Sequence, residues 1–414
     1  MSKARGPRKN TAKPNRPLDP LLACGLKRGM RGQMFKEATS SGTTVKGFSV
    51  GNYVTAGTAV SGTTTLSDIF GISPPSNETI TGVAYDKTGN LWITFAASAN
   101  CPPSSGSAAS SKIVEYSANS LANGAPAETG QSISVSNGNV AGIAFDSSGN
   151  LWTTVGCLSN ISNSGTVSMY PILSGGTIST TPTYSITNQY GPNNSSTGYQ
   201  PVSVFFDFSG NLWISNTNSG SASGPFLVYA ASEIPPKSTT QPTAPFMIMN
   251  VTVGSDAQLV QGASFDRHGN LWSGVICSNV NRINCSQPYS HVIEFQSATL
   301  SNLMATGGTV TKSPDYSFQA PGTVAAPSGY AYTSNDTYFA GGAEFDSGGN
   351  LWVAIGALSN STGSLDLSAQ TFFFQYSSSS LGNSNPTPIN EFPLTPGSVG
   401  FSAFWPIPNG LPVY

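Results

Sequence analysis

One octapeptide recurs five times along the chain. Its copies read YDKTGNLW, FDSSGNLW, FDFSGNLW, FDRHGNLW and FDSGGNLW, and the tryptophans that end them are 60, 61, 59 and 80 residues apart. A nearly fixed period of this length indicates one structural unit per repeat, packed against its neighbours. The longer last interval predicts an insertion before the fifth copy.

Each repeat holds four short segments of strand character. Two flank the turn of the motif, as in GIAFD and NLWTTV, a third ends in an aromatic residue, as in KIVEYS, and a weaker fourth follows, as in QSISVS. Their residues alternate at period two, which is typical of strands. With 45 glycines and only 9% charged residues, the composition is also that of an all-β chain. Four antiparallel strands per repeat predict the blades of a β-propeller.

The two ends of the chain predict how the ring closes. In the C-terminal segment GFSAFWPIPNGLPVY, Phe404 and Leu411 take the places of the motif aromatic and leucine. Before the first motif, VKGFSVGNYV and TTTLSDI suit a third and a fourth strand. We therefore predict a six-bladed propeller over residues 40–414, with the last blade shared between 40–72 and 397–414. Closure by strands from both termini hides the sheet edges.

The charge is unevenly distributed. Ten of the 17 Lys and Arg lie in residues 1–36, against one acidic residue, Asp19, and the rest of the chain has seven basic and 18 acidic residues. Residues 1–39 are therefore predicted to be a basic, disordered tail. A body with a charge of about −11 does not suit nucleic-acid binding. Since no run of 18 apolar residues occurs, we expect no transmembrane segment. We also expect a monomer.

Cysteine usage bears on the compartment. Apart from Cys24, the chain has Cys101, Cys157, Cys277 and Cys285, which allow three pairings. Cys277 and Cys285 are spaced for a local bridge, while Cys101 and Cys157 follow the tryptophans of neighbouring repeats. Two disulfides favour an oxidising compartment, so we expect an extracytoplasmic protein, although the start shows no convincing signal peptide.

The repeat unit resembles a known group of propellers. GIAFDSSGNLWTTV, followed by an aromatic-ended strand, is similar to the repeats of NHL-type and gluconolactonase-like (TolB-like) propellers, a group that includes the virginiamycin B lyases. The similarity covers nearly the whole chain after residue 40. It implies that the first strand of each blade lines the centre, with the motif turns on one face and the ligand site among the loops of the other.

The repeated polar residues are predicted to be structural. The motif aspartates should accept backbone N–H groups across a tight turn whose glycine has positive φ. Five turns spaced around a ring lie too far apart to share one cation, which argues against a metal site. The five tryptophans should fill the wedges between neighbouring sheets.

Candidate site residues are found where a repeat departs from the pattern. Glu344 stands just before the motif aromatic, where other copies have Ala, Ser or Phe, and is the first candidate for a catalytic or metal-binding group. His291 is a second catalytic candidate because it begins a third strand near the loop face. Candidates for ligand binding come from the insertion and from positions before other first strands: Tyr330, Tyr332, Asn335, Asp336, Tyr338, Glu78, Gln200 and Gln261.

Two functions remain open. The first is a non-catalytic propeller that binds a protein or a glycan on the loop face and needs no cofactor. The alternative is a metal-dependent, lactonase-like hydrolase or a lyase, using calcium or magnesium near Glu344 at the channel mouth. The resemblance implies metal ligands of Glu, Asn and Asp, or His and Glu in the lyases, yet only Glu344 is matched in place and no His-x-His pair occurs. The missing residues favour the binding protein.

Overall fold

The structure is a computed structural model. It describes residues 33–36, 45–49, 70–76, 78–97, 110–136, 138–156, 165–187, 200–217, 224–238, 240, 242, 244–254, 256–277, 291–320, 336–346, 348–359, 372–393 and 402–405.

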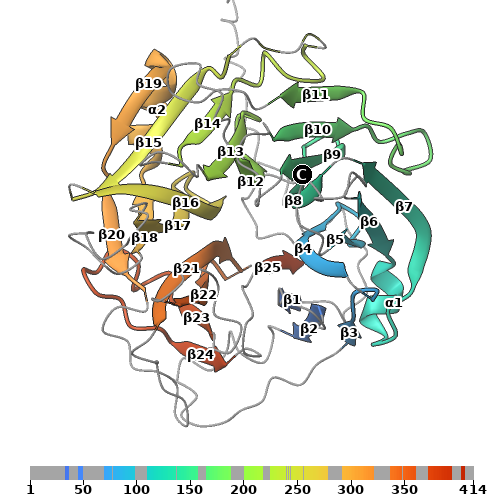
Figure 1. Cartoon of the computed structure of the whole chain (residues 1–414). Helices are drawn as coiled ribbons and strands as arrows, with labels where there is room; N and C mark the ends of the chain where they lie inside the picture. The colour runs from blue at the N-terminus through green and yellow to red at the C-terminus, as the bar shows by residue number, and fades with distance from the viewer. Residues whose placement is uncertain are drawn as a thin grey trace, which may run out of the picture.

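The described strands form five hydrogen-bonded sheets around a common centre (Figure 1). In three of them, four antiparallel strands follow one another in chain order from the centre outward. The first contains β4 (Glu78–Tyr85), β5 (Leu91–Ala97), β6 (Ser110–Tyr116) and β7 (Glu128–Ser136). The second contains β8 (Asn139–Phe145), β9 (Leu151–Gly156), β10 (Thr166–Tyr170) and β11 (Tyr184–Thr187). The third contains β21 (Asp336–Phe345), β22 (Leu351–Ser359), β23 (Phe372–Tyr376) and β24 (Asn390–Pro393).

A fourth sheet has nine strands and spans two repeats. One repeat supplies β12 (Gln200–Phe206), β13 (Leu212–Thr217), β14 (Phe226–Tyr229) and β15 (Met247–Val253). The next supplies β16 (Asp256–Phe265), β17 (Leu271–Cys277), β18 (His291–Phe295) and β20 (Tyr316–Gln319). Between β18 and β20, the chain forms α2 (Ser297–Thr306) and β19 (Gly308–Lys312), and β19 pairs in parallel with β15. A shorter helix, α1 (Ala118–Ala122), follows β6.

The prediction of six separate blades is wrong as a count of sheets, because the structure has five. The reason is the short link between β15 and β16, where Val253 pairs with Asp256 and Thr252 with Ala257. Gly254 adopts a φ of 61° in this link, a conformation that glycine allows. The two four-strand ladders therefore continue into each other as one hydrogen-bonded sheet.

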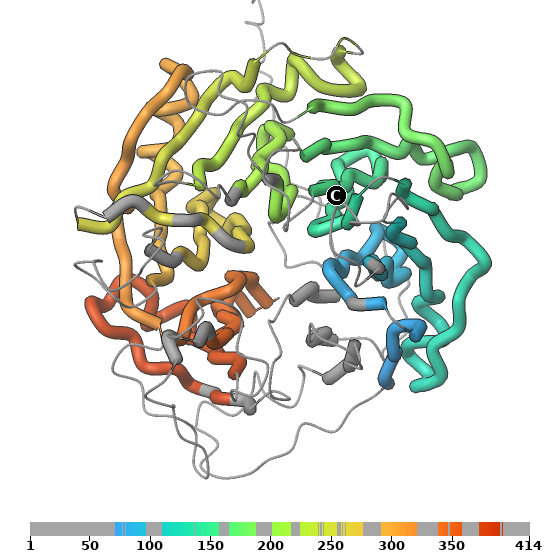
Figure 2. Tube along the Cα trace, viewed as in Figure 1, coloured from blue at the N-terminus to red at the C-terminus, as the bar shows by residue number. Residues whose placement is uncertain are grey.

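The fifth sheet joins the two ends of the chain, as predicted. The C-terminal strand β25 (Ser402–Trp405) lies innermost and pairs with β1 (Gln33–Lys36), followed by β2 (Val45–Ser49) and β3 (Phe70–Ile72). We predicted two strands from the C-terminus. Among the described residues the C-terminal segment supplies one, and β1, from the segment expected to be a tail, takes the second position. β25 lies beside both β21 and β4, so the ring is closed (Figure 1). The coloured part of the trace in Figure 2 follows the other sheets around the centre in chain order.

The repeated aspartate ties three strands of its sheet together. In the copy at Asp146, Oδ1 accepts the backbone N–H groups of Ser148 and Asn150, and Oδ2 accepts the Asn150 amide and the Trp152 indole N–H at 2.8 and 3.0 Å. Asn150 Oδ1 in turn accepts the backbone N–H of Ile172, just after the third strand, at 3.0 Å. The same indole bond occurs at the other four turns, at 2.9 to 3.2 Å. The structural role predicted for the aspartates is confirmed.

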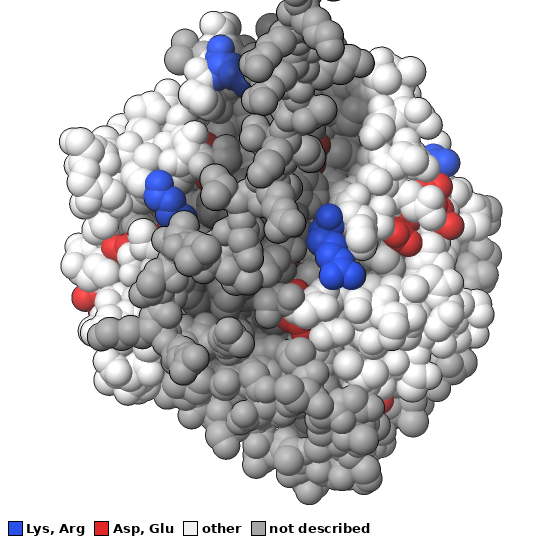
Figure 3. All heavy atoms as spheres, turned by 180° about the vertical axis from the view of Figure 1, so that it is seen from behind, with Lys and Arg blue, Asp and Glu red and all other residues white. Residues whose placement is uncertain are grey.

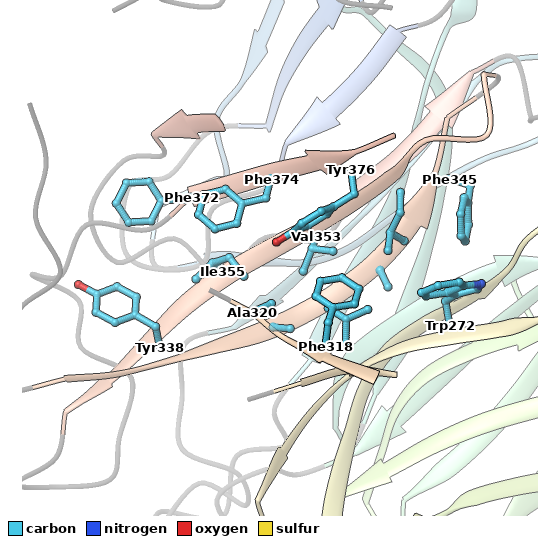
Figure 4. Close-up of a cluster of buried hydrophobic side chains, with 14 of the residues drawn as sticks. Trp272, Phe318, Ala320, Tyr338, Phe345, Val353, Ile355, Phe372, Phe374 and Tyr376 are labelled. Carbon is cyan, nitrogen blue, oxygen red and sulfur yellow. The ribbon is translucent and has the colours of Figure 1, made fainter. Parts of the chain in front are cut away.

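The five tryptophans fill the spaces between neighbouring sheets. Each is at most 2% exposed. Four of them belong to clusters of buried apolar side chains: Trp92, Trp152, Trp213 and Trp272. Trp272 reaches from β17 toward Phe318 and Phe345, in a cluster that also holds Tyr376 of the next sheet (Figure 4). Burial of such large apolar areas is the main favourable term in a fold of this kind. The packing role predicted for the tryptophans is confirmed.

The inner strands approach so closely that small residues are required. A Cβ placed on Gly274 would lie 2.3 Å from the Ala340 carbonyl oxygen of the neighbouring sheet, and one on Gly142 would lie 2.8 Å from that of Val202. Both neighbours are backbone atoms and do not rotate away. The inner end of each sheet is therefore held in a fixed position against the next.

Asp346 provides a test of the turn network, because five N–H donors converge on its carboxylate, including Gln375 Nε2 at 2.9 Å. We expect Asp346→Ala to lower the free energy of unfolding by about 3 kcal/mol or more, since several buried donors lose their acceptor. Urea denaturation followed by tryptophan fluorescence measures this.

Two further variants control that test. Asp346→Asn keeps the shape of the side chain and turns one acceptor into a donor, so it should also destabilise the fold. Glu128→Ala removes an exposed carboxylate and should change stability by less than about 0.5 kcal/mol. Equal stability of Asp346→Asn and the parent protein would show that the hydrogen bonds contribute little.

Candidate functional site

The ring has two distinct ends. The inner strands β4, β8, β12, β16 and β21 each end at an Asp-x-x-Gly-Asn turn, which we call an Asp-Gly-Asn turn after its three repeated residues. These five turns share one end of the ring, which we call the turn face. The other end, where the first strands begin, is the loop face. Glu78, Gln200 and Asp336 begin β4, β12 and β21 and thus lie at the loop face, as predicted from their places in the repeat. Gln261 lies further along its strand, at the register shift in β16 between Val260 and Ala263.

Two acceptor atoms at the loop face are buried without a hydrogen bond. They are Oε2 of Glu78 and Oδ1 of Asn139, which begin the inner strands of neighbouring sheets. These strands lie side by side, since a Cβ on Gly82 of β4 would be 3.5 Å from the Ala141 carbonyl oxygen of β8. Asn139 was not among the predicted residues, although it too begins a first strand.

His291 is enclosed in the protein. The ring is 6% exposed, neither of its nitrogens has a hydrogen-bond partner, and burial lowers the pKa of the imidazole. The side chain is therefore neutral at physiological pH. A general base must reach a substrate proton or a water, and at this depth the ring offers little access, so a catalytic role for His291 stays a prediction.

The predicted aromatic ligand contacts are only partly visible. Tyr338 is 7% exposed and packs in a core cluster with Ala320, Ile355 and Phe372 (Figure 4). Its ring thus contributes to the core, and its predicted role in ligand binding stays a prediction. Tyr330, Tyr332 and Asn335 lie outside the described residues, as do Cys101, Cys157 and Cys285, while Cys277 ends β17.

Glu344 lies between two sheets. Its cross-strand partner is Trp352, and in the equivalent position Phe205 pairs with Trp213. Phe205 faces the following repeat, where its ring lies 5.9 Å from that of Phe265. The same register directs Glu344 toward the sheet that contains β25, which runs beside β21.

The surroundings of Glu344 penalise its charged form. Water still reaches part of the side chain, but protein atoms surround most of it, and this burial raises the pKa of Glu344 to about 8. The carboxyl is therefore mainly protonated at neutral pH. It lies eight residues beyond Asp336 on one strand, or about 26 Å from the loop face at ~3.3 Å per residue. Glu344 and the loop-face residues thus cannot contact the same small ligand.

The described residues give a metal ion no evident site. Among them, no group of three or more His, Cys, Asp or Glu side chains is placed to hold a cation. Glu344 is included in that statement, so the metal-dependent alternative gains no set of ligands from the described part of the chain.

The surface is poor in charge. On the face shown in Figure 3, the Lys, Arg, Asp and Glu side chains are few and scattered among uncharged residues. Within the described part of the chain, no helix is long and apolar enough to cross a membrane.

Comparisons with known proteins give distant likenesses in structure. No family model matches the sequence, and no curated protein matches it. The periplasmic gluconolactonase of Pseudomonas aeruginosa is 11% identical, with a TM-score of 0.47 over 87% of this chain and 82% of that one. A protein of unknown function from Bacteroides caccae is 8% identical, with a TM-score of 0.42 over 88% and 99%.

A gluconolactonase from Xanthomonas campestris is 9% identical, with a TM-score of 0.36 over 92% of this chain and 99% of that one. At TM-scores below 0.5 and identities this low, no activity or location transfers to this chain. The resemblance to NHL repeats and to virginiamycin B lyases stays a prediction.

The pH dependence of stability tests the environment of Glu344. Its pKa in the folded protein, about 8, lies above that of an unfolded glutamate, about 4.3, so the unfolded chain releases the proton first. The group therefore has no effect on stability below about pH 4, and destabilises the folded state increasingly as pH rises toward 8.

Glu344→Gln should remove this term. The variant should gain stability over the parent protein as pH rises from 5 to 8, by at most about 1.4 kcal/mol per pH unit, and the difference should level off above pH 8. Urea denaturation at several pH values measures it. A difference that does not change with pH would mean that the carboxyl is already ionised in the folded protein.

Proposed function

We propose that this chain is a non-catalytic binding propeller whose loop face takes a glycan or a protein ligand. The observation that carries the proposal is the pair of buried acceptors on adjacent inner strands, Glu78 Oε2 and Asn139 Oδ1. Leaving a buried acceptor without a donor costs about 1–3 kcal/mol, so a ligand that supplies N–H or O–H groups gains from binding here. We expect this binding to occur outside the cytoplasm.

A glycan is the first ligand class to test. Sugar hydroxyls can donate to the acceptors on these two neighbouring sheets, and only 9% of the residues of the chain are charged. A protein ligand would satisfy the same acceptors through amide N–H groups. Both classes rest on the same pair of oxygens.

The metal-dependent hydrolase or lyase is the second candidate. Its support is Glu344, a carboxyl on an inner strand where other repeats have Ala, Ser or Phe. The position of that carboxyl between sheets, far from the loop face, makes the binding protein the better supported function.

Loss of loop-face binding tests the proposal. The purified full chain is screened against a glycan array, and the strongest glycan is titrated by calorimetry. We expect the double variant Glu78→Gln, Asn139→Ala to bind it at least about tenfold more weakly, since the loss of one acceptor, at about 1.4 kcal/mol, already corresponds to tenfold.

Glu128→Ala is the matched control, because Glu128 begins β7 at the turn face and is exposed. It should bind like the parent protein. Unchanged binding by the double variant would refute a site at these two residues. One divalent cation per chain in elemental analysis, together with lactone hydrolysis that Glu344→Gln abolishes, would establish the enzyme instead.

A further inference from the structure

A hollow lies on the turn face of the molecule, away from the loop face. It has a volume of about 470 Å³ and lies between the fourth and fifth Asp-Gly-Asn turns. Its lining includes Arg267, His268, Glu294, Gln296 and Ser378. A smaller hollow of about 380 Å³ adjoins it, shares Arg267 and His268, and has the apolar residues Phe208, Leu300 and Met304 in its wall.

Glu294 is the unusual residue of this hollow. It lies on β18 as the cross-strand partner of Trp272, and it is only 8% exposed. No hydrogen bond joins its carboxyl to any residue that the structure describes. A carboxyl buried to this degree in a cavity wall normally has donors, so its lack of one points to a donor that comes from outside the chain.

In two other repeats, the polar side chain at the equivalent position has a hydrogen-bond partner. Glu115 occupies the same position beside Trp92, and its carboxylate accepts hydrogen bonds from Asn90 Nδ2, at 2.7 Å, and from Thr129 Oγ1. Gln375 occupies it beside Trp352 and donates to Asp346 Oδ2 at 2.9 Å. At this one repeat position, Glu115 and Gln375 have hydrogen-bond partners, whereas Glu294 lines a hollow.

The groups around Glu294 are mostly acidic. Burial, together with repulsion from Asp266 in the turn and Asp315 before β20, raises the pKa of Glu294 to about 7. Burial raises the pKa of Tyr316 on β20, and the charge of Glu294 adds to this rise. Lys312 lies 3.9 Å from Asp315 and partly offsets that carboxylate.

Asp266 supplies no donor to Glu294, because its carboxylate oxygens act as acceptors, here for N–H groups of His268, Asn270 and Trp272. Arg267 is exposed, with its Nε 3.2 Å from His268 Nε2, so water and salt screen its charge. The unmet requirement in the hollow is for both a positive charge and hydrogen-bond donors.

We propose that the turn-face hollow binds a primary ammonium group, with Glu294 as its acceptor. An ammonium supplies three N–H donors and one positive charge, which meets both requirements. A neutral hydroxyl supplies a donor but leaves the carboxylates unbalanced. The group belongs either to a small free amine or to a lysine side chain of a peptide, and the adjoining apolar hollow has room for the attached hydrocarbon.

The test uses n-butylamine and n-butanol, which differ only in the charged group, titrated into the full chain and followed by NMR. We expect n-butylamine to bind and n-butanol not to bind. Affinity for n-butylamine should rise about tenfold from pH 6 to pH 8, because the ionised fraction of Glu294 rises about tenfold across that interval.

Glu294→Gln is the informative variant because it copies Gln375 of the next sheet, which the fold already accommodates. It should lose at least tenfold in affinity for n-butylamine and also lose the pH dependence. The matched control, Glu115→Gln, alters the equivalent carboxylate that already has its donors, and it should bind like the parent protein.

The two sources of the ammonium are separated by a third probe, the peptide acetyl-Gly-Lys-Gly-amide. Tighter binding of the peptide than of n-butylamine assigns the site to lysine side chains, and weaker binding assigns it to free amines. Equal binding of n-butanol, unchanged binding by Glu294→Gln, or no binding of either amine probe overturns the proposal. None of these outcomes affects the loop-face site, because a glycan bound there should be retained by Glu294→Gln.

Discussion

The hydrogen bond from the tryptophan indole to the aspartate carboxylate is the interaction on which the ring depends. It fixes the largest side chain of each of five repeats relative to its own turn, at 2.9 to 3.2 Å. Since the tryptophan also fills the space between sheets, the turn chemistry and the spacing of the sheets are coupled. The motif asparagine also accepts a hydrogen bond from the residues just after the third strand, for example from the backbone N–H of Ala118 to Asn90 Oδ1. A single octapeptide thus joins local turn geometry to the packing of whole sheets.

Such a frame makes departures from the repeat easy to interpret. Because the repeats share one backbone geometry, a side chain that differs in one repeat can be compared directly with the residues at the equivalent position in the others. Phe205 fills its position by stacking against Trp213, whereas Glu344 brings an ionisable group into the equivalent place. Glu115, Glu294 and Gln375 form a second such series, in which only the surroundings of Glu294 leave the carboxyl without a donor among the described residues. Comparison within one chain therefore identifies unusual sites without any related sequence.

The sequence predicted the fold to the extent that local patterns determine it. Period-two alternation and the tryptophan spacing gave the four-stranded units, and the residues at both termini gave the closure of the ring. The count of sheets was wrong because the two-residue link at Gly254 joins β15 to β16, and a loop of that kind looks like any other gap between strands. Helix α2 and strand β19 were missed because a run rich in Ser, Thr and Asn has weak propensity for either structure. Their position depends on pairing with β15, which is a tertiary contact.

The candidate sites were harder to predict, because they depend on what lies across from a side chain. Tyr338 looked like a surface residue in a loop-rich insertion, yet the sheet turns it into the core. Glu344 was expected near the ligand face, yet strand direction carries it to the opposite end of β21. The two faces consequently differ in chemistry: at the loop face one carboxylate oxygen and one amide oxygen lack donors, whereas at the turn face Glu294 lies near the carboxylates of Asp266 and Asp315. A ring of similar repeats can therefore offer two binding sites of different selectivity, because the residues at its two ends have different neighbours.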